Sequence, residues 1–279
     1  MSSILKSLVR ANPRVHQRVV ALRARLFPDE NAWLRRYLGL LTRSVDEPVF
    51  VKIGAHDGVT GDPCGDFFLL NHAWTGLLVE PVPYCVAKLR AAYGDSSRFK
   101  IDPGAAGSTS CRATFYYVSQ DAEASLPDLP SWYDQLGSFD PQHIIKHLEG
   151  RLEPFIVSRE VDVTPLDAIL DRHGVTTVHF LQIDAEGHDL EVLKGLDFDI
   201  HAPLVILIEH KHLSPDDRSE VETLLVRRGY EVHDIGADFF AVHRSSPGLP
   251  EAPLGLGACR RYARRGPNAG RTSASWRRS

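Results

Sequence analysis

The chain has 279 residues, 43% of them hydrophobic and 24% charged, a composition typical of a soluble globular protein rather than a disordered or fibrous one. Its formal net charge of −4 is unevenly distributed, because residues 48–244 hold 16 basic and 31 acidic groups whereas both ends of the chain are basic. A nucleic-acid-binding protein needs a basic patch on its folded surface, so this acidic globule predicts no nucleic-acid partner.

Residues 1–47 are predicted to form a helical extension. Apolar residues recur at helical spacing between Val15 and Leu26 and again between Trp33 and Leu41. We expect both stripes to pack on the globule. For the first, basic helix, peripheral contact with an anionic membrane and a transit peptide are alternative interpretations.

From Val49 onward, short apolar strands alternate with helices, which predicts an α/β domain over residues 48–244 with a parallel sheet covered on both faces. Parallel strands are expected at 49–53, 76–79, 98–101, 178–183 and 204–208. An antiparallel pair at 230–235 and 239–243 closes the sheet. Helices are expected at 66–71, 82–93, 190–193 and 219–228. The segment 114–118 is an extra strand, and 104–107 is a turn of small residues.

Residues 119–160 interrupt this alternation and are predicted to be an insertion that lids the site on the substrate side. Its aromatic residues Trp132, Tyr133 and Phe139 are candidates to stack on a sugar or to cover an apolar acceptor, although a small satellite core is an equal alternative. Residues 245–279 are rich in Gly, Pro, Ser and Arg, which predicts a basic, mostly disordered tail.

The most informative stretch is VFVKIGAHDG, from Val49 to Gly58. An apolar strand runs into a turn in which Gly54 and Gly58 can adopt backbone angles closed to other residues, so the chain can approach a ligand closely. The next predicted strand ends at Glu80, which is placed to accept hydrogen bonds from ribose hydroxyls. Together these residues predict a nucleotide-type cofactor. The alternative is a glycine-rich surface turn with an unrelated glutamate.

A second motif, QIDAEGHDLEVLKG, contains Asp184 at the end of an apolar strand and His188 in the following turn. Ligands of open α/β sheets bind at the carboxyl ends of the strands, so we expect Asp184 beside the first turn. The next strand brings Glu209, His210 and His212 to the same edge. Our candidates for a general base are Asp184, then His210, then Glu209.

The residues at this carboxyl edge of the sheet also suggest a different hypothesis, in which Asp184, His210 and His212 hold a divalent metal. No HExxH-type spacing supports a metal, so we predict none. His143 and His147 lie four residues apart on an expected helix of the insertion. That spacing can bind metal, but we favour substrate contact or solvent exposure for these two histidines.

The motifs VKIGAHDG, VDVTPLDAIL and above all QIDAEGHDLEVLKG, with the acid at Glu80, resemble the FkbM-type S-adenosylmethionine-dependent methyltransferases. The resemblance covers roughly residues 49–244. It implies a Rossmann-like class I methyltransferase fold, with a seven-stranded, mostly parallel sheet and a C-terminal antiparallel strand pair. It also implies O-methylation of a sugar, glycolipid or polyketide-like hydroxyl, with S-adenosylmethionine as cofactor.

The resemblance also implies roles for individual residues. The turn that would wrap the methionine and ribose part of the cofactor comprises Gly54, Ala55, His56, Asp57 and Gly58. Glu80 would bind the ribose, Asp102 with Ala105 and Ala106 would lie near the adenine, and Asp184 would lie near the methionine and the acceptor. The residues expected to contact the acceptor are Trp132, Tyr133, Phe139, His143, His188 and His212. One position departs from the family pattern, because Lys52 stands where an acid is usual, and a cation cannot accept a hydrogen bond from the cofactor's ammonium group.

We therefore predict an S-adenosylmethionine-dependent O-methyltransferase. A nicotinamide-dependent oxidoreductase, a non-catalytic binding module of a biosynthetic assembly and a metal-dependent hydrolase are the rival hypotheses. The four cysteines are widely spaced and no secretory signal or membrane-spanning run is evident, so we expect a cytoplasmic location. No sequence feature predicts the oligomeric state.

Overall fold

The computed structural model describes residues 31–94 and 96–246. Its central sheet has seven strands in the order β3-β2-β1-β7-β8-β10-β9. Their bounds are β1 (Val49–Ile53), β2 (Thr75–Val79), β3 (Phe99–Asp102), β7 (Phe180–Ile183), β8 (Val205–Glu209), β9 (Tyr230–Asp234) and β10 (Asp238–His243). All neighbours from β3 to β8 pair in parallel, whereas β10 runs antiparallel to both β8 and β9. The predicted seven-stranded, mostly parallel sheet with a C-terminal antiparallel pair is confirmed.

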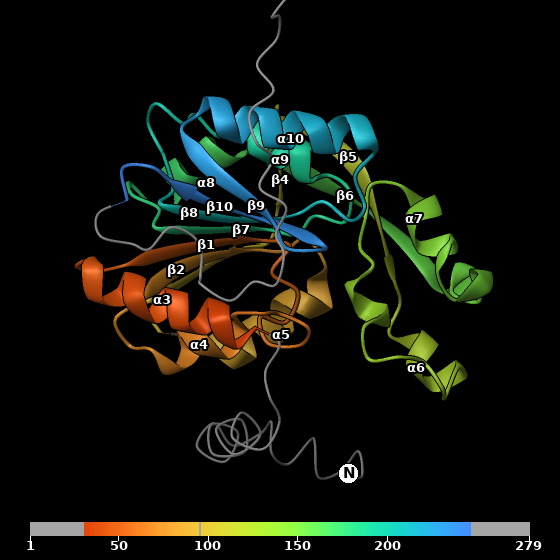
Figure 1. The fold of residues 1–279 in the computed structure, drawn as a ribbon. Helices are drawn as coiled ribbons and strands as arrows, with labels where there is room; N and C mark the ends of the chain where they lie inside the picture. The colour runs from red at the N-terminus through yellow and green to blue at the C-terminus, as the bar shows by residue number, and fades with distance from the viewer. Residues whose placement is uncertain (1–30, 95, 247–279) are drawn as a thin grey trace, which may run out of the picture.

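Helices cover both faces of this sheet, and the central strands bury side chains on both sides (Figure 1). On one face lie α3 (Ala32–Ser44), α4 (Gly65–Leu70) and α5 (Pro83–Tyr93). On the other lie α8 (Leu166–Arg172), α9 (Asp189–Lys194) and α10 (Pro215–Arg227). Because successive side chains of a strand point to opposite faces, Phe50 packs with the first group and Val51 with the second.

The helix α3 is fixed by its apolar stripe. Leu34, Tyr37, Leu38 and Leu41 are buried in the same core as Phe50 and form one side of the helix. The packing predicted for this second stripe is therefore confirmed. The first predicted helix and its alternatives, like nearly all of the basic tail, lie outside the described residues. Within the described part of the chain, no helix combines the length and apolarity that crossing a membrane requires.

A second, three-stranded sheet was not predicted. It has the order β4-β6-β5, with β4 (Ala105–Gly107), β5 (Cys111–Val118) and β6 (Ile156–Pro165). The expectation of a turn at 104–107 is wrong, because β4 pairs in parallel with the end of β6. The expected strand at 114–118 is confirmed and is longer, since β5 pairs antiparallel with β6 along its whole length.

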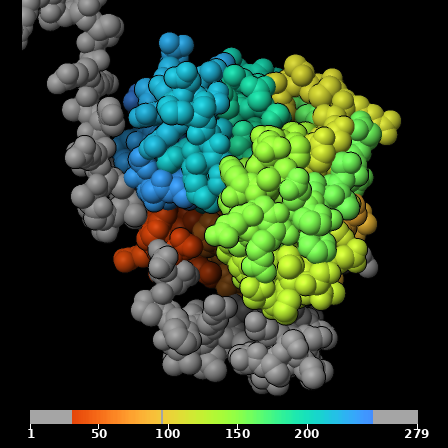
Figure 2. Space-filling model, turned by 90° about the vertical axis from the view of Figure 1, so that its right-hand side faces the viewer, coloured from red at the N-terminus to blue at the C-terminus, as the bar shows by residue number. Residues whose placement is uncertain are grey.

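The insertion follows β5 and leads into β6, at one end of this second sheet (Figure 1). Its short helices are α6 (Asp121–Ser125), η1 (Tyr133–Gln135), α7 (Pro141–Ile145), η2 (His147–Gly150) and η3 (Glu153–Phe155). The insertion forms much of one side of the molecule, where it is drawn in yellow-green to green (Figure 2). It ends in β6, so its last residues belong to the second sheet.

Candidate functional site

A pocket lies at the carboxyl ends of β1, β2 and β7, with an inner volume of about 100 Å³. The sheet contributes the turn after β1, the end of β2 and the end of β7, and the insertion contributes one wall. Residues predicted from the sequence that line this pocket are Gly54, Ala55, His56, Glu80, Ala105, Ala106, Phe139, Asp184 and His188. The structure therefore brings the two sequence motifs together, as the position of ligand sites in open α/β sheets requires.

The turn after β1 depends on Gly54. This residue has φ of +72°, and a Cβ atom placed on it would lie 1.7 Å from the backbone oxygen of Asp184. The backbone N–H groups of Gly54 and Ala55 both donate to the carbonyl of Val79, at 3.0 and 3.1 Å. The missing side chain thus lets the β1 turn lie directly against the end of β7 and brings the two halves of the pocket into contact.

Glu80 is buried at the end of β2 and is held by the main chain. One carboxylate oxygen accepts from the backbone N–H of His56 and the other from that of Val82, both at 2.8 Å. Burial raises the pKa of Glu80, and these two hydrogen bonds oppose the rise. A carboxylate oxygen has room for a second hydrogen bond, so Glu80 can still accept from a ligand in the pocket.

Three residues predicted to contact the cofactor lie outside the pocket lining. Asp57 accepts hydrogen bonds from the backbone N–H groups of Val59 and Thr60, at 2.9 and 2.6 Å, and so shapes the turn. Gly58 lies against the ring of Tyr93.

Asp102, at the end of β3, is the third of these residues. It forms an ion pair with Arg172 at 2.9 Å and a hydrogen bond with His173 at 2.8 Å, and it accepts from the backbone N–H of Gly104. Its carboxylate therefore ties β3 to α8. The cofactor contacts predicted for Asp57, Gly58 and Asp102 remain predictions.

Lys52, the departure from the family pattern, lines the pocket and is only 1% exposed. Its ammonium group pairs with the carboxylate of Asp62, which also lines the pocket. Asp62 is fixed in turn, because it accepts a hydrogen bond from the backbone N–H of Cys64 at 2.8 Å. The buried cation is thus neutralised by an acid from the loop after β1, and this acid was not predicted from the sequence.

The insertion forms its wall of the pocket through Asp134 and Gln135. Asp134 faces His56 at 3.2 Å and pairs with Lys88 of α5 at 2.6 Å, while Gln135 donates to the carbonyl of Thr60 at 2.8 Å. Burial disfavours the charged form of His56, but the adjacent carboxylates of Asp134 and Asp57 outweigh it and raise the pKa of His56 to about 12. A charged histidine therefore joins the insertion to the β1 turn.

Asp184 ends β7 and lines the pocket beside the β1 turn. Burial, followed by the charges of Glu209 and Glu186, raises the pKa of Asp184 well above its ordinary value. Asp189 shapes the turn that follows, because its carboxylate accepts from the backbone N–H groups of Ala185 and Gly187, at 2.8 and 3.0 Å. Asp189 thus fixes the turn that follows Asp184.

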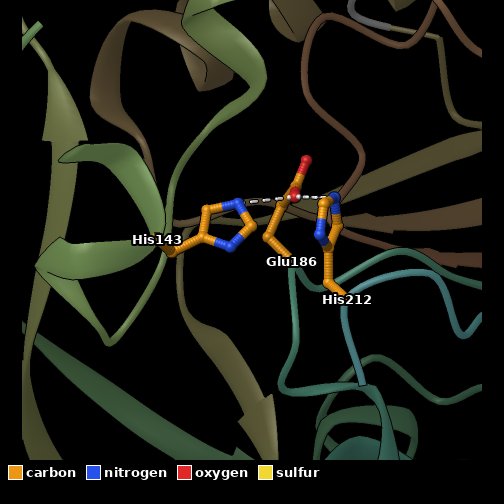
Figure 3. Close-up of side chains that lie close together, drawn as sticks. All are labelled: His143, Glu186 and His212. Carbon is orange, nitrogen blue, oxygen red and sulfur yellow. Dashed lines mark ion pairs between the residues drawn. The ribbon is translucent and has the colours of Figure 1, made fainter. Parts of the chain in front are cut away.

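Glu186 meets two histidines at the rim of the pocket (Figure 3). Its Oε2 atom lies 2.9 Å from Nε2 of His143, in α7 of the insertion, and 3.3 Å from Nε2 of His212, in the loop after β8. Glu186 has φ of +50°, a conformation uncommon outside glycine. The predicted acceptor contacts of His143 and His212 remain predictions, but the structure places both side chains around one carboxylate.

The two other base candidates lie farther from the pocket than Asp184. His210 turns away from it, since its ring packs on Phe239 with centroids 4.2 Å apart and its Nε2 lies 3.4 Å from Asp234. Glu209 is buried behind the rim, and burial followed by the charge of Glu186 raises its pKa to about 8. The structure therefore does not bring His210 to the pocket, because apolar packing on β10 holds its ring elsewhere.

The aromatic residues of the insertion divide between two environments. Phe139 lines the pocket, with its ring on Phe115 at 5.1 Å and on His188 at 4.7 Å between centroids. Tyr133 is buried in a small core of the insertion, as the alternative interpretation expected, whereas Trp132 is 39% exposed. Phe139 and His188 thus form the aromatic part of the pocket wall.

The lining residues that were not among the predicted site residues include the acids and amides Asp62, Asp134, Gln135, Gln182 and Glu186. Gln182 had a signal in the sequence, since it is a polar residue within the apolar strand that ends at Asp184. Glu186 lies inside the quoted motif. Nothing in the sequence indicated Asp134 and Gln135, because they reach the pocket only through the docking of the insertion.

The strand order, with a ligand pocket at the carboxyl ends of its central strands, is that of a class I methyltransferase fold. The family model described as the methyltransferase FkbM domain matches residues 52–232, and the chain belongs to this family of methyltransferases. The resemblance noted in the sequence is therefore confirmed. A comparison with curated proteins found no match.

Solved structures of low identity are also similar to this chain. The methyltransferase FkbM from Methylobacillus flagellatus KT is 20% identical, with a TM-score of 0.45, and the match covers 71% of this chain and 44% of that one. The precorrin-6y C5,15-methyltransferase from Geobacter metallireducens GS-15 is 12% identical, with a TM-score of 0.33 and coverage of 75% and 85%. A fibrillarin/Nop5p complex is 9% identical, with a TM-score of 0.35 and coverage of 76% and 83%. This chain spans less than half of the Methylobacillus protein.

Proposed function

We propose that this protein transfers a methyl group from S-adenosylmethionine to a hydroxyl oxygen of a sugar, glycolipid or polyketide-like acceptor. The observation that carries the proposal is the single pocket lined by the glycine turn after β1, by Glu80 at the end of β2 and by Asp184 at the end of β7. Membership of a methyltransferase family supports methyl transfer as the reaction.

The groups around the pocket fit this cofactor chemically. Glu80 can accept from the two ribose hydroxyls while it keeps its main-chain hydrogen bonds. Asp62 offsets the charge of Lys52, and Asp184 is a carboxylate suited to the ammonium or sulfonium group of the cofactor. The side-chain oxygen of Gln182 is buried at the pocket without a hydrogen-bond partner and offers a further acceptor.

The size of the pocket indicates how the cofactor enters. Ligand sites typically enclose roughly 300–1,000 Å³, whereas this pocket measures about 100 Å³. The sheet side is fixed by strand pairing, but the insertion wall is joined to it by side-chain contacts of Asp134 and Gln135. We therefore expect the insertion to move outward when the cofactor binds, which is the lid role that the sequence predicted.

The mechanism assigns two tasks to the chain's own residues. Bound S-adenosylmethionine supplies an electrophilic methyl group, so the protein has to align an acceptor oxygen and take up its proton. Asp184 is the candidate base, since it lines the pocket at the end of β7. Phe139 and His188 form the wall on which the acceptor rests. A positioned base contributes about 10²–10⁴-fold to the rate.

The test is calorimetry of the chain with S-adenosylmethionine and, separately, with NAD⁺. We expect only the methyl donor to bind, and binding of NAD⁺ alone would support the oxidoreductase hypothesis instead. Methyl transfer is then followed with labelled S-adenosylmethionine and glycolipid extracts of the organism that makes this protein. Asp184→Asn should lower turnover by about 10²–10⁴-fold, while Asp216→Asn, at an exposed position in α10, should keep it. Wild-type turnover in Asp184→Asn would remove this residue as the base.

A further inference from the structure

We infer that His143, Glu186 and His212 form a binding site for one divalent transition-metal ion, at the rim where the insertion meets the sheet. One nitrogen or oxygen of each residue lies within 4.8 Å of the others. The three residues come from three separate segments, α7 of the insertion, the loop after β7 and the loop after β8, and their side chains point toward one another (Figure 3). The sequence predicted no metal, and the metal hypothesis it raised used Asp184 and His210 with His212.

The polar atoms of this cluster lack other partners. Nε2 of His143 and Oε2 of Glu186 are fully buried and face each other at 2.9 Å, but without the alignment of a hydrogen bond. His143 itself is only 5% exposed. A misaligned contact recovers only part of the cost of desolvating the two atoms, which is about 1–3 kcal/mol for a buried atom with no partner at all. A cation satisfies both atoms at once.

The separations are those that a metal ion requires. Ligand atoms of tetrahedral zinc lie at 2.0–2.2 Å from the ion, which places any two of them about 3.3–3.5 Å apart. Glu186 Oε2 is 3.3 Å from His212 Nε2 and 2.9 Å from His143 Nε2, so a small outward shift of His143 accommodates an ion.

Further ligands lie next to these three. Nε2 of His147 is also buried without a hydrogen-bond partner, and its ring lies 5.3 Å from that of His143 and 6.1 Å from that of His212, between centroids. Oε2 of Glu209, another buried atom without a partner, lies 3.9 Å from His212 Nε2. The site therefore has two candidates for a fourth metal ligand, His147 on the insertion and Glu209 on the sheet.

The donor set selects the kind of metal. Two imidazoles with one carboxylate suit Zn²⁺ and other first-row divalent ions, whereas Mg²⁺ prefers oxygen ligands. Because His143 belongs to the insertion and Glu186 lines the pocket, a bound ion would join the insertion to the pocket rim. The inference concerns metal binding alone and does not depend on the proposed methyl transfer.

The probe is ZnCl₂, added to the untagged full chain after treatment with a chelator and dialysis. Calorimetry should show one ion per chain. His143→Ala and His212→Ala should each weaken the affinity at least 100-fold, and Glu186→Gln at least 10-fold. His233→Ala is the matched control, because His233 also lies 3.5 Å from a glutamate, Glu231, but on the edge strand β9 and outside the cluster, and it should bind zinc like the wild type.

A second measurement does not depend on how the variants fold. Co²⁺ added to the wild-type chain should give the visible absorption of a cobalt ion with histidine ligands, and Zn²⁺ should displace it. Circular dichroism of each variant checks its fold. The inference is overturned if the wild-type chain binds no zinc and shows no such cobalt band, or if His143→Ala, His212→Ala and His233→Ala bind zinc equally well.

Discussion

Glu80 and Glu186 are both acids beside the carboxyl end of a parallel strand and both line the pocket, but they are held by different parts of the protein. The oxygens of Glu80 accept from two backbone N–H groups close to it in the fold, those of His56 and Val82. Oε2 of Glu186 instead faces two imidazoles from distant segments and makes no hydrogen bond.

This difference divides the residues of the pocket into two groups. We call them the donor side, after the proposed methyl donor, and the rim. The donor side, formed by the turn after β1 and the end of β2, is organised by the main chain and by one glycine, so its geometry exists before any ligand binds. The rim, formed by His143, Glu186 and His212, depends on side chains that meet only when the insertion docks. The donor side is therefore fixed by the main chain, while the rim depends on the docking of the insertion.

The largest expected effect tests the donor side through its backbone. Gly54→Ala forces a Cβ atom against the carbonyl of Asp184 and places a side chain at positive φ. We expect a loss of about 3 kcal/mol or more in the free energy of unfolding, from overpacking and backbone strain together. Urea denaturation measures it.

Gly39→Ala is the matched control for this substitution. Gly39 lies within α3 with open space around it, so alanine there should raise stability by about 0.5–1 kcal/mol. Equal stability of Gly54→Ala and the wild type would show that the turn after β1 is not constrained as described.

An intermediate effect tests the carboxylate of the donor side. Glu80→Gln replaces one acceptor oxygen by an amide group that cannot accept, so we expect the affinity for S-adenosylmethionine to fall by about 1–3 kcal/mol, or roughly 5–150-fold. Calorimetry measures it. Glu160→Gln on β6, where the carboxylate only meets Thr114, should bind the cofactor like the wild type. An unchanged affinity in Glu80→Gln would exclude Glu80 from the cofactor site.

An effect that is smaller at any one step of pH, and is spread over several pH units, tests the contact between the donor side and the insertion. The pKa of His56 is raised to about 12 in the folded chain, against about 6.5 in the unfolded chain. Its contribution to stability is therefore complete below pH 6.5 and is lost progressively as the pH rises from there toward 12.

His56→Gln should remove this part of the pH dependence. Between pH 6.5 and 9 the unfolding free energy of the wild type should fall more steeply than that of the variant, by at most about 1.4 kcal/mol per pH unit. Urea denaturation at several pH values measures the slopes, and His72→Gln, at an exposed position, should keep the wild-type slope. Parallel curves for His56→Gln and the wild type would contradict a charged His56.

The strands of the large sheet were predicted within about two residues at each end. Val49–Ile53 and Phe180–Ile183 are short apolar runs that stop at a glycine or an acid, and such runs bury themselves on both faces of a parallel sheet. The strand Ile156–Pro165 was missed because half of its residues are polar and only Val161 and Val163 are buried, so it shows no apolar run. Its pairing partner, β5, lies some forty residues earlier in the chain, which no local pattern reveals.

The sequence by itself determined the fold class, the family and the donor side of the site, because strand periodicity, the glycine turn and the acids at strand ends are short-range features with direct structural consequences. Only the tertiary structure decided that Asp62 offsets Lys52, that His210 faces Phe239, and that His143 meets Glu186 and His212. Those contacts join residues that are far apart in the chain or turned by local packing. Their geometry follows from how the insertion and the loops dock on the sheet.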